Sequence, residues 1–288
     1  MKNLNRRSFL SKAAMGFGGV FALSQLPSEL FAAAKFVNIP VGFQTYPVKD
    51  RMAKDFPGTM KEMAGLGYNI TEMCYPADYA QGGFGWAKDM KAAEIKKVIE
   101  DAGLKCPSSH FGMGGLSPEK IDTSIEWAKA MGLSQMICST FWLPKGSTLA
   151  DYYKECDKLN KAAEKINAAG MEAGFHNHDM EFHELEGKLI YDELVTHLDK
   201  RVKLQFQTQV VTLGYKASDY FKKYPGRFIS SHLSDWSADK KEVPIGSGVI
   251  DWKEYFAAAK IGGVKNFFVE EEGNPDNMRT SATYIKSL

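Results

Sequence analysis

The stretch that decides the fold runs from Leu149 to His176 and reads LADYYKECDKLNKAAEKINAAGMEAGFH. Apolar residues recur with helical period from Leu149 to Ala169, and the pattern stops at Gly170. A glycine here is typical of a helix C-cap, because it adopts a left-handed backbone without steric cost. The β-prone run from Met171 to His176 follows at once. The stretch therefore predicts one unit of helix, glycine and strand.

The same unit recurs along the chain from residue 39 onward. The eight runs that predict strands are Ile39–Gln44, Ile70–Cys74, Lys105–His110, Gln135–Thr140, Met171–His176, Lys203–Thr208, Arg227–Leu233 and Asn266–Glu271. The helical stretches between them include Phe56–Leu66, Ala92–Ala102, Pro118–Met131, Leu149–Ala169 and Trp252–Ile261. Strands that alternate with helices indicate an α/β protein with a parallel sheet.

Eight such units predict a single (β/α)8 TIM barrel, an eight-stranded parallel barrel with outer helices. An open doubly wound sheet is the rival, and it usually carries a glycine-rich phosphate loop after its first strand. Gln44-Thr45-Tyr46-Pro47-Val48 stands at that place instead. The closed barrel is therefore the predicted fold.

The first 34 residues differ from the rest of the chain. Arg6 and Arg7 precede Ser-Phe-Leu, a modest apolar run follows, and Ala32-Ala33-Ala34 offers a small-residue cleavage site. The paired arginines are similar to a twin-arginine export signal. We therefore expect residues 1–34 to be a twin-arginine-type signal peptide and residues 35–288 to be the barrel domain. The expected location is periplasmic or otherwise exported.

Composition excludes some classes of partner. The formal net charge is +1 over 288 residues, which argues against nucleic acid as a ligand. Beyond the signal, no apolar run approaches the length of a membrane span, so no stable membrane insertion is expected. The four cysteines match no zinc or redox spacing, and the sequence specifies no disulfide pair. The oligomeric state stays open, with a homo-oligomer among the alternatives.

Barrel enzymes carry their chemistry at the carboxyl ends of the strands. Four of the six histidines fall at these ends. The polar and aromatic residues there are Gln44, Tyr46, Glu72, His110, Trp142, His176, His178, Glu181, Gln207, His232, Asp235, Trp236 and Glu270–Glu272. Carboxylates and imidazoles without thiolates suit Mn²⁺, Mg²⁺, Co²⁺ or Zn²⁺. A site for one divalent cation is therefore one interpretation of this ring.

Several motifs carry a resemblance to a known family. They are GFQTYPVKD at 42–50, GFHNHDMEF at 174–182, YPGRF at 224–228 leading to His232 and Asp235, and IGSGVIDW at 245–252. On these motifs the chain resembles the xylose isomerase-like TIM barrels, the group of sugar phosphate isomerases and epimerases. The match covers essentially the whole chain after the signal.

The resemblance implies a set of metal ligands and a reaction. One divalent cation would be held by Glu181, Gln207, His232 and Glu270, and His176 or His178 would be an alternative to Glu181. Glu181 and Glu270 would be the acid/base pair for proton transfer next to a sugar carbonyl. Tyr46, His110, His176, His178, Asp235 and Trp236 would contact the substrate, a small-molecule carbohydrate. Glu72 is balanced between a site residue and a structural one.

Three positions depart from the pattern of the family. Gln207 stands where relatives have Asp, which removes one negative charge from the metal's shell. Ser234 replaces a common Lys, and Ser247 replaces a common Glu.

Three functions follow as alternatives. The first is an exported sugar isomerase or epimerase acting on a free sugar or glycoside, because phosphorylated sugars are mainly cytoplasmic. The second is a lyase that cleaves 3-keto-glycosides by β-elimination, and the third is a non-catalytic carbohydrate-binding barrel with a degraded metal site.

Overall fold

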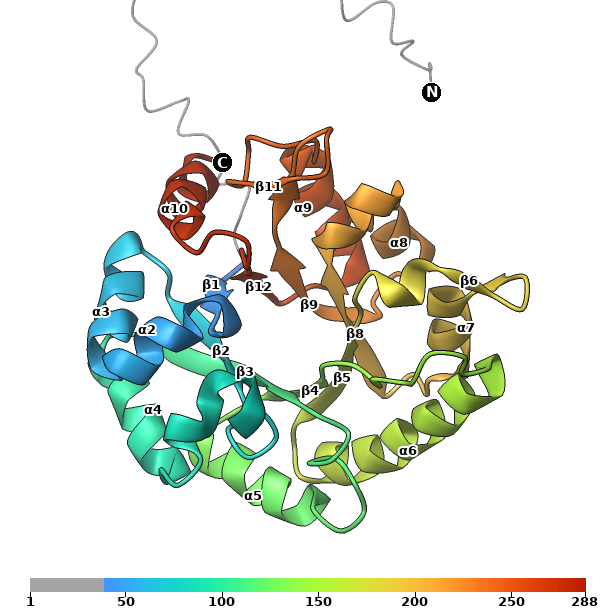
Figure 1. Ribbon diagram of the computed structural model, residues 1–288, viewed down its shortest axis with the longest axis horizontal. Helices are drawn as coiled ribbons and strands as arrows, with labels where there is room; N and C mark the ends of the chain where they lie inside the picture. The colour runs from blue at the N-terminus through green and yellow to red at the C-terminus, as the bar shows by residue number, and fades with distance from the viewer. Residues whose placement is uncertain (1–38) are drawn as a thin grey trace, which may run out of the picture. The chain divides into compact units, whose positions relative to one another are not determined.

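A computed structural model of the chain describes residues 39–288. Eight parallel strands form one closed barrel in the order β1-β12-β9-β8-β5-β4-β3-β2, and β1 pairs with both β2 and β12 to close it (Figure 1). The strands are β1 (Val41–Gln44), β2 (Ile70–Cys74), β3 (Lys105–Phe111), β4 (Gln135–Cys138), β5 (Glu172–His176), β8 (Val202–Gln207), β9 (Phe228–Leu233) and β12 (Asn266–Val269). The predicted barrel is confirmed, and each predicted strand coincides with one of these.

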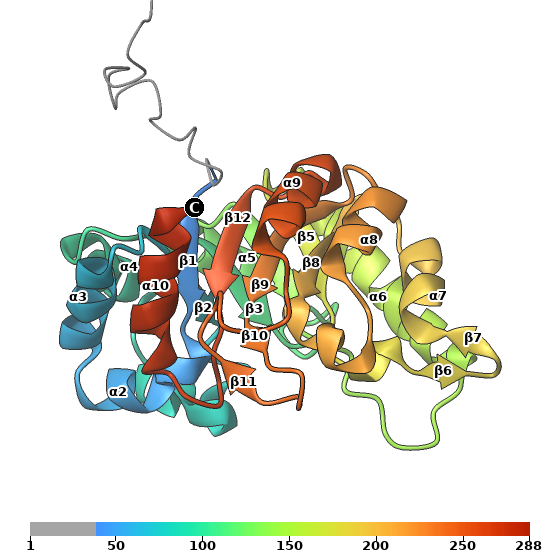
Figure 2. The same cartoon turned by 90° about the horizontal axis from the view of Figure 1, so that it is seen from above.

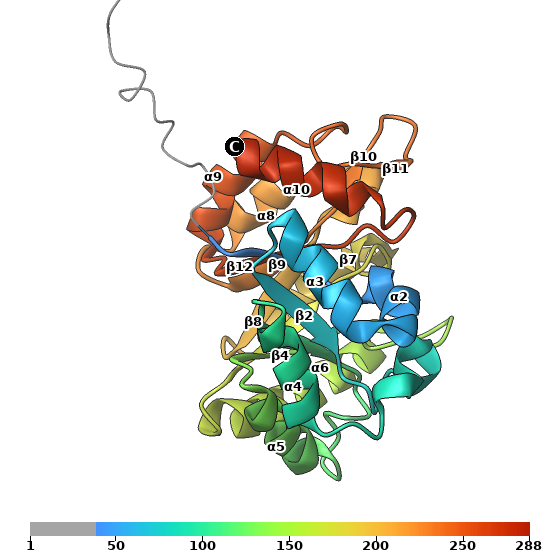
Figure 3. The same ribbon diagram turned by 90° about the vertical axis from the view of Figure 1, so that its left-hand side faces the viewer.

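Helices surround the strands (Figure 1). They are α2 (Lys49–Lys54), α3 (Phe56–Leu66), α4 (Ala92–Asp101), α5 (Ile121–Met131), α6 (Leu149–Ala168), α7 (Ile190–His197), α8 (Ala217–Lys223), α9 (Trp252–Gly262) and α10 (Asn277–Ser287). The predicted helices correspond to α3, α4, α5, α6 and α9. The last helix, α10, lies beside α3 and completes the outer ring (Figure 3), with the Tyr68 hydroxyl donating to the Met278 carbonyl.

Local chemistry explains the helix–glycine–strand unit around α6. Thr148 and Asp151 form a capping box at its first turn, with the Thr148 amide donating to the Asp151 carboxylate at 3.0 Å. At its other end Gly170 has φ +85°, a conformation that favours glycine. The chain then turns directly into β5, as predicted.

The carboxyl ends of the strands share one end of the barrel, which we call the mouth (Figure 2). Two short hairpins lie in the loops there: β6 (Glu184–Leu185) with β7 (Lys188–Leu189), and β10 (Asp235–Trp236) with β11 (Glu242–Val243). Short helical segments also follow the strands: η2 (Tyr46–Val48), η3 (Ala80–Phe84), η4 (Gly85–Ala87), η5 (Met180–Phe182) and η6 (Thr208–Leu213). The strands end one or two residues before Thr140 and Glu270, so these residues belong to the mouth.

Two further features bear on the sequence predictions. Within the described residues, no helix has both the length and the apolar character needed to cross a bilayer. All four cysteines are buried and free. The expected signal peptide at residues 1–34 lies outside the described residues.

Candidate functional site

A buried carboxylate, Glu72 on β2, is the centre of the polar network inside the mouth. Its side chain is fully buried. Hydrogen bonds reach its oxygens from Ser108 at 2.5 Å, Gln205 at 2.8 Å and Gln44 at 3.2 Å. Burial alone would raise its pKa, but His110 and His232 outweigh that effect and lower the pKa of Glu72 to about 2. Glu72 is therefore an ionised, fully satisfied group.

His232 at the end of β9 joins Glu72 to a second carboxylate. Its Nε2 lies 2.5 Å from Glu72, and its Nδ1 lies 2.7 Å from Glu270. Burial opposes its charge, yet the two carboxylates raise the pKa of His232 to about 10. Burial also acts against ionisation of Glu270, but the His232 charge lowers the pKa of that carboxyl. One imidazolium between two carboxylates leaves one net negative charge on this group of three residues.

Three histidines meet beside this charge. The ligand atoms of His110, His176 and His232 lie within 4.8 Å of one another. Burial lowers the pKa of His110 and His176, so both rings are neutral. Nδ1 of His176 is buried without a hydrogen-bond partner among the described residues.

Neutral His110 and His176 beside a net negative charge suit a divalent cation. His232 can join them as a ligand once it gives up a proton, while Glu72 holds its Nε2 from behind, as carboxylates commonly do for metal-bound histidines. These three histidines could therefore hold a metal ion. His176 stands at the corner that the sequence left open between Glu181 and a histidine.

The predicted metal set is only partly brought together. Gln207 Nε2 donates to Glu270 Oε2 at 2.7 Å, so Gln207, His232 and Glu270 do meet. Gln207 presents its amide nitrogen to the Glu270 carboxylate. A carboxylate at position 207 would instead repel Glu270.

Glu181, in η5, has no hydrogen bond to this group among the described residues. Its carboxylate accepts from the His178 amide at 2.7 Å, and burial raises its pKa to about 8. Glu181 is therefore a neutral carboxyl group that accepts a backbone hydrogen bond in the turn after β5. Its predicted role as ligand and base stays a prediction.

The mouth holds a cavity that we call lobe one, with a volume of about 1070 Å³. It is lined by Tyr46, Cys74, Asp78, Tyr79, Gly82, His110, Gly112, Ser139, Thr140, Trp142, His176, His178, Glu270 and Glu272. Four predicted substrate residues, Tyr46, His110, His176 and His178, therefore share one cavity. Burial lowers the pKa of His178 to about 4, so it is neutral. Trp142 stands over His178 with ring centroids 5.9 Å apart.

A second cavity, which we call lobe two, has a volume of about 880 Å³. It is lined by Gln207, Gln209, Ser234, Trp236, Lys241, Glu242, Glu270, Glu272, Gly273 and Asn274. The two lobes share Glu270 and Glu272. Glu272 is exposed at the mouth, but reduced hydration between the walls and the nearby charge of Glu270 raise its pKa to about 7.

Asp235, a predicted substrate residue, serves the loop after β9. Its side chain is fully buried. One oxygen accepts from the amides of Gly246 and Gly248 and from the indole of Trp252 at 2.9 to 3.0 Å. The other accepts from the amide of Trp236 at 2.9 Å. Asp235 therefore fixes the backbone that carries Trp236, and it lines neither lobe.

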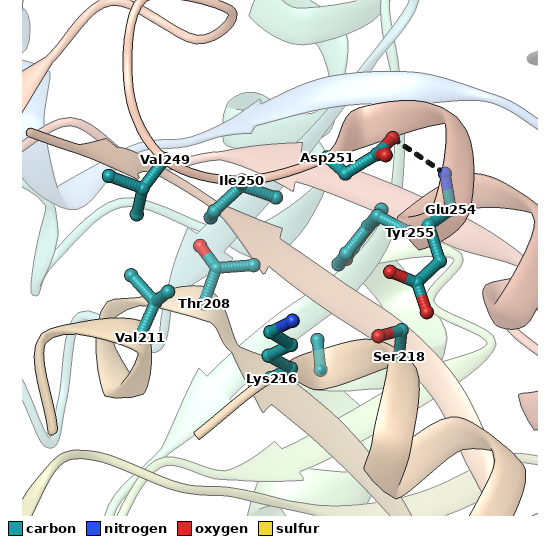
Figure 4. Close-up of a pocket in the computed structure, with 10 residues that line it drawn as sticks. Thr208, Val211, Lys216, Ser218, Val249, Ile250, Asp251, Glu254 and Tyr255 are labelled. Carbon is teal, nitrogen blue, oxygen red and sulfur yellow. Dashed lines mark hydrogen bonds between the residues drawn. The ribbon is translucent and has the colours of Figure 1, made fainter. Parts of the chain in front are cut away.

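A third cavity, of about 470 Å³, lies between η6, the start of α8 and the start of α9 (Figure 4). Its acidic groups have structural partners: Asp251 caps α9 through the amide of Glu254, and Glu254 pairs with Lys222. We therefore assign the chemistry to the mouth rather than to this cavity.

Gln205 was not predicted as a site residue from the sequence, but it lies inside the barrel and hydrogen-bonds Glu72, Ser230 and His110. Gln205 links β8 to three other strands, because it donates to Glu72 and to Ser230 and accepts from His110 at 2.6 Å. A signal was present, because Gln205 and Gln207 are two residues apart on one strand, and Ser230 and His232 are two residues apart on the next. That spacing puts both side chains on the same face of a strand.

Comparison with known proteins agrees with this architecture. Two solved structures of a sugar phosphate isomerase/epimerase from Parabacteroides distasonis ATCC 8503 resemble the chain. One has a TM-score of 0.72 and 23% identity over 91% of this chain and 98% of that one. The other has a TM-score of 0.70 and 24% identity over 85% and 97%. The IOLI protein, solved with a bound zinc atom, has a TM-score of 0.61 and 14% identity over 86% and 94%.

At these identities the likeness shows the fold. No curated protein matches the chain significantly. The sequence profile of one family, described as the xylose isomerase-like TIM barrel, matches residues 60–288. The chain therefore belongs to the xylose isomerase-like TIM barrel family.

Proposed function

We propose that the mouth binds a carbohydrate and transfers a proton at the carbon next to its carbonyl group, as a sugar isomerase or epimerase does. The observation that carries this proposal is the pair Glu270 and Glu272, two carboxylates that face the same cavities with pKa values pushed apart. Such a pair supplies a base and an acid at neutral pH.

The two carboxylates would divide the reaction between them. Gln207 and His232 both bond Oε2 of Glu270, which leaves its Oε1 for the substrate. Ionised Glu270 removes the proton from the carbon next to the carbonyl, and the electrons of the broken C–H bond form an enediolate. In an epimerisation, protonated Glu272 returns a proton to the opposite face of the same carbon. In an isomerisation, it returns a proton to the former carbonyl carbon while the proton of the adjacent hydroxyl moves to the former carbonyl oxygen, and exchange with solvent then restores both carboxyl groups. His232 holds Glu270 in place. This pair replaces Glu181 and Glu270, because Glu181 lines neither lobe.

We also propose that a divalent cation, Mn²⁺, Mg²⁺, Co²⁺ or Zn²⁺, binds at His110, His176 and His232. When bound, it would polarise the carbonyl of the sugar. A relative of the same fold was solved with zinc, which supports a cation here. Glu72 would keep His232 oriented for that role.

The screen for turnover uses free aldoses and ketoses, glycosides and 3-keto-glycosides, with products analysed by NMR. We expect the wild-type protein to form a product from at least one of these sugars. Glu270→Gln and Glu272→Gln should each lower the rate of its formation at least tenfold, whereas Glu126→Gln, an exposed change on α5, should keep the wild-type rate. An isomer or epimer supports the proposed reaction, and cleavage of a 3-keto-glycoside would assign the lyase alternative. Sugar binding without any product would support the alternative of a non-catalytic carbohydrate-binding barrel. The amide of Gln207 beside Glu270, in place of a carboxylate, favours that alternative.

Export completes the proposal. We propose that residues 1–34 act as a twin-arginine-type signal, because Arg6 and Arg7 precede an apolar run and a small-residue cleavage site. Fractionation of expressing cells should find the mature chain outside the cytoplasm. Arg6→Lys/Arg7→Lys should retain the uncleaved chain inside, and an unchanged location would contradict the proposal.

A further inference from the structure

The two lobes of the mouth meet at Glu270 and Glu272. Apart from these two acids, which follow β12, lobe one is lined by residues at or after the ends of β1 to β5, and lobe two mainly by residues at or after the ends of β8, β9 and β12. Because β12 lies between β1 and β9 in the closed barrel, the shared acids stand where the two halves join. Each lobe is concave and lined by aromatic and polar side chains, as small-ligand sites commonly are. A ligand centred on the acids can therefore extend into both.

Each lobe also carries one tryptophan. Trp142 in lobe one is 70% exposed and has φ +48°, an uncommon conformation for a bulky residue. Its amide donates to the Thr140 hydroxyl at 3.3 Å, which helps to hold the turn. Trp236 in lobe two is half-buried, and its indole donates to the Ser234 hydroxyl at 3.1 Å. Large rigid rings at these places offer apolar contact area for the face of a sugar ring.

The charges of the two lobes select against phosphate. Among the residues that line them, Lys241 is the one ammonium group, and it pairs with Asp239 at 2.8 Å. Lobe two has three acidic residues in its lining, including Glu242, whose carboxylate accepts from the Gly273 amide at 3.0 Å. An anionic phosphate would meet like charges there, which disfavour binding. Neutral hydroxyl groups would instead find amide and carboxylate partners.

We propose that the mouth binds a neutral disaccharide, with one ring in each lobe and the linkage over Glu270 and Glu272. This inference rests on the proposed function for the identity of the reacting group, but it makes a separate statement about binding. Trp142 would stack on the first ring. Trp236 would stack on the second ring, and Gln209 would hydrogen-bond its hydroxyl groups.

The test measures dissociation constants by isothermal titration calorimetry on the full chain. The probes are cellobiose, maltose, lactose and trehalose, compared with glucose, galactose and glucose 6-phosphate. We expect at least one disaccharide to bind tenfold or more tightly than its component monosaccharide, and glucose 6-phosphate to bind no more tightly than glucose.

Variants locate the second ring. Trp236→Ala and Gln209→Ala should each reduce the ratio of disaccharide to monosaccharide affinity at least threefold, and Trp236→Phe should restore part of it. Lys161→Ala, an exposed change on α6, should keep the wild-type ratio. Thermal unfolding identifies any variant that fails to fold, in which case the other carries the test.

The inference is overturned if no disaccharide binds more than twofold tighter than its monosaccharide, or if both lobe-two variants keep the wild-type ratio. These outcomes differ from failure of the proposed function. A preference for disaccharides without turnover would contradict only the proposed proton transfer. Turnover of monosaccharides without such a preference would contradict only the inference that the ligand has two rings.

Discussion

Replacing Glu181 by Gln should make stability less dependent on pH. Burial raises the pKa of Glu181 to about 8 from an ordinary 4.5, so the folded protein holds a proton that the unfolded chain releases. The sign follows directly: this group costs nothing below pH 4.5, and it destabilises the fold progressively as the pH rises to about 8. One proton is worth about 1.4 kcal/mol per pH unit, so the full loss is on the order of 4 to 5 kcal/mol.

The variant resembles the protonated side chain in shape. Its amide oxygen can still accept from the His178 amide, which Glu181 now bonds at 2.7 Å. We therefore expect Glu181→Gln to match the wild type within about 1 kcal/mol at pH 5 and to exceed its stability by several kcal/mol at pH 8. Urea unfolding followed by circular dichroism at pH 5, 6, 7 and 8 measures the difference.

The exposed Glu126→Gln on α5 is the matched control, and its curve should run parallel to that of the wild type. Parallel curves for Glu181→Gln as well would refute the reasoning, because they would mean that Glu181 is ionised in the folded protein. In that case its predicted role as a metal ligand would regain support, and the variant should also lose bound Mn²⁺.

Gln207→Asp places a carboxylate beside Oε2 of Glu270, where the amide now donates at 2.7 Å. We expect the metal-free variant to lose about 1 to 3 kcal/mol in urea unfolding and to bind Mn²⁺ more tightly in equilibrium dialysis. Asp235→Asn should lower stability by about 2 to 4 kcal/mol in thermal unfolding, because an amide cannot accept every bond that the carboxylate accepts, whereas the exposed Asp89→Asn should change little. Zinc binding should displace about one proton from His232, whose pKa is about 10. The binding enthalpy measured by calorimetric titration should therefore differ between buffers of different ionisation enthalpy, and the affinity for zinc should fall at lower pH.

Alternation along the chain was enough to predict the barrel. Each helix–glycine–strand unit is local, as the capped α6, Gly170 and β5 illustrate, and a parallel sheet of eight such units closes in one way. The ends of strands were less certain. Thr140 and Glu270 follow directly on the apolar runs, but β4 ends at Cys138 and β12 at Val269, although the Glu270 amide still donates to the Leu233 carbonyl at 2.9 Å.

The site was predicted less completely, for a physical reason. The predicted strand ends placed His110, His176, His178 and His232 at one end of the barrel, because position along a strand is visible in sequence. Which carboxylate meets which histidine depends on distances across the barrel, such as the 2.5 Å between Glu72 and His232. Sequence spacing contains no such information for residues 160 positions apart. The same limit explains why Glu181 and Asp235 could be placed near the mouth but not assigned to backbone amides.

The most direct test of the central claim is exchange of carbon-bound hydrogen in heavy water. The wild-type protein is incubated in D₂O with a panel of aldoses, ketoses and 3-keto-glycosides, and deuterium at the carbon next to the carbonyl is followed by NMR. We expect wild type to incorporate deuterium into at least one of them, Glu270→Gln to lose that incorporation, and Glu181→Gln to keep it. Exchange that depends on Glu181 and persists in Glu270→Gln would contradict the account, as would the absence of exchange with every sugar.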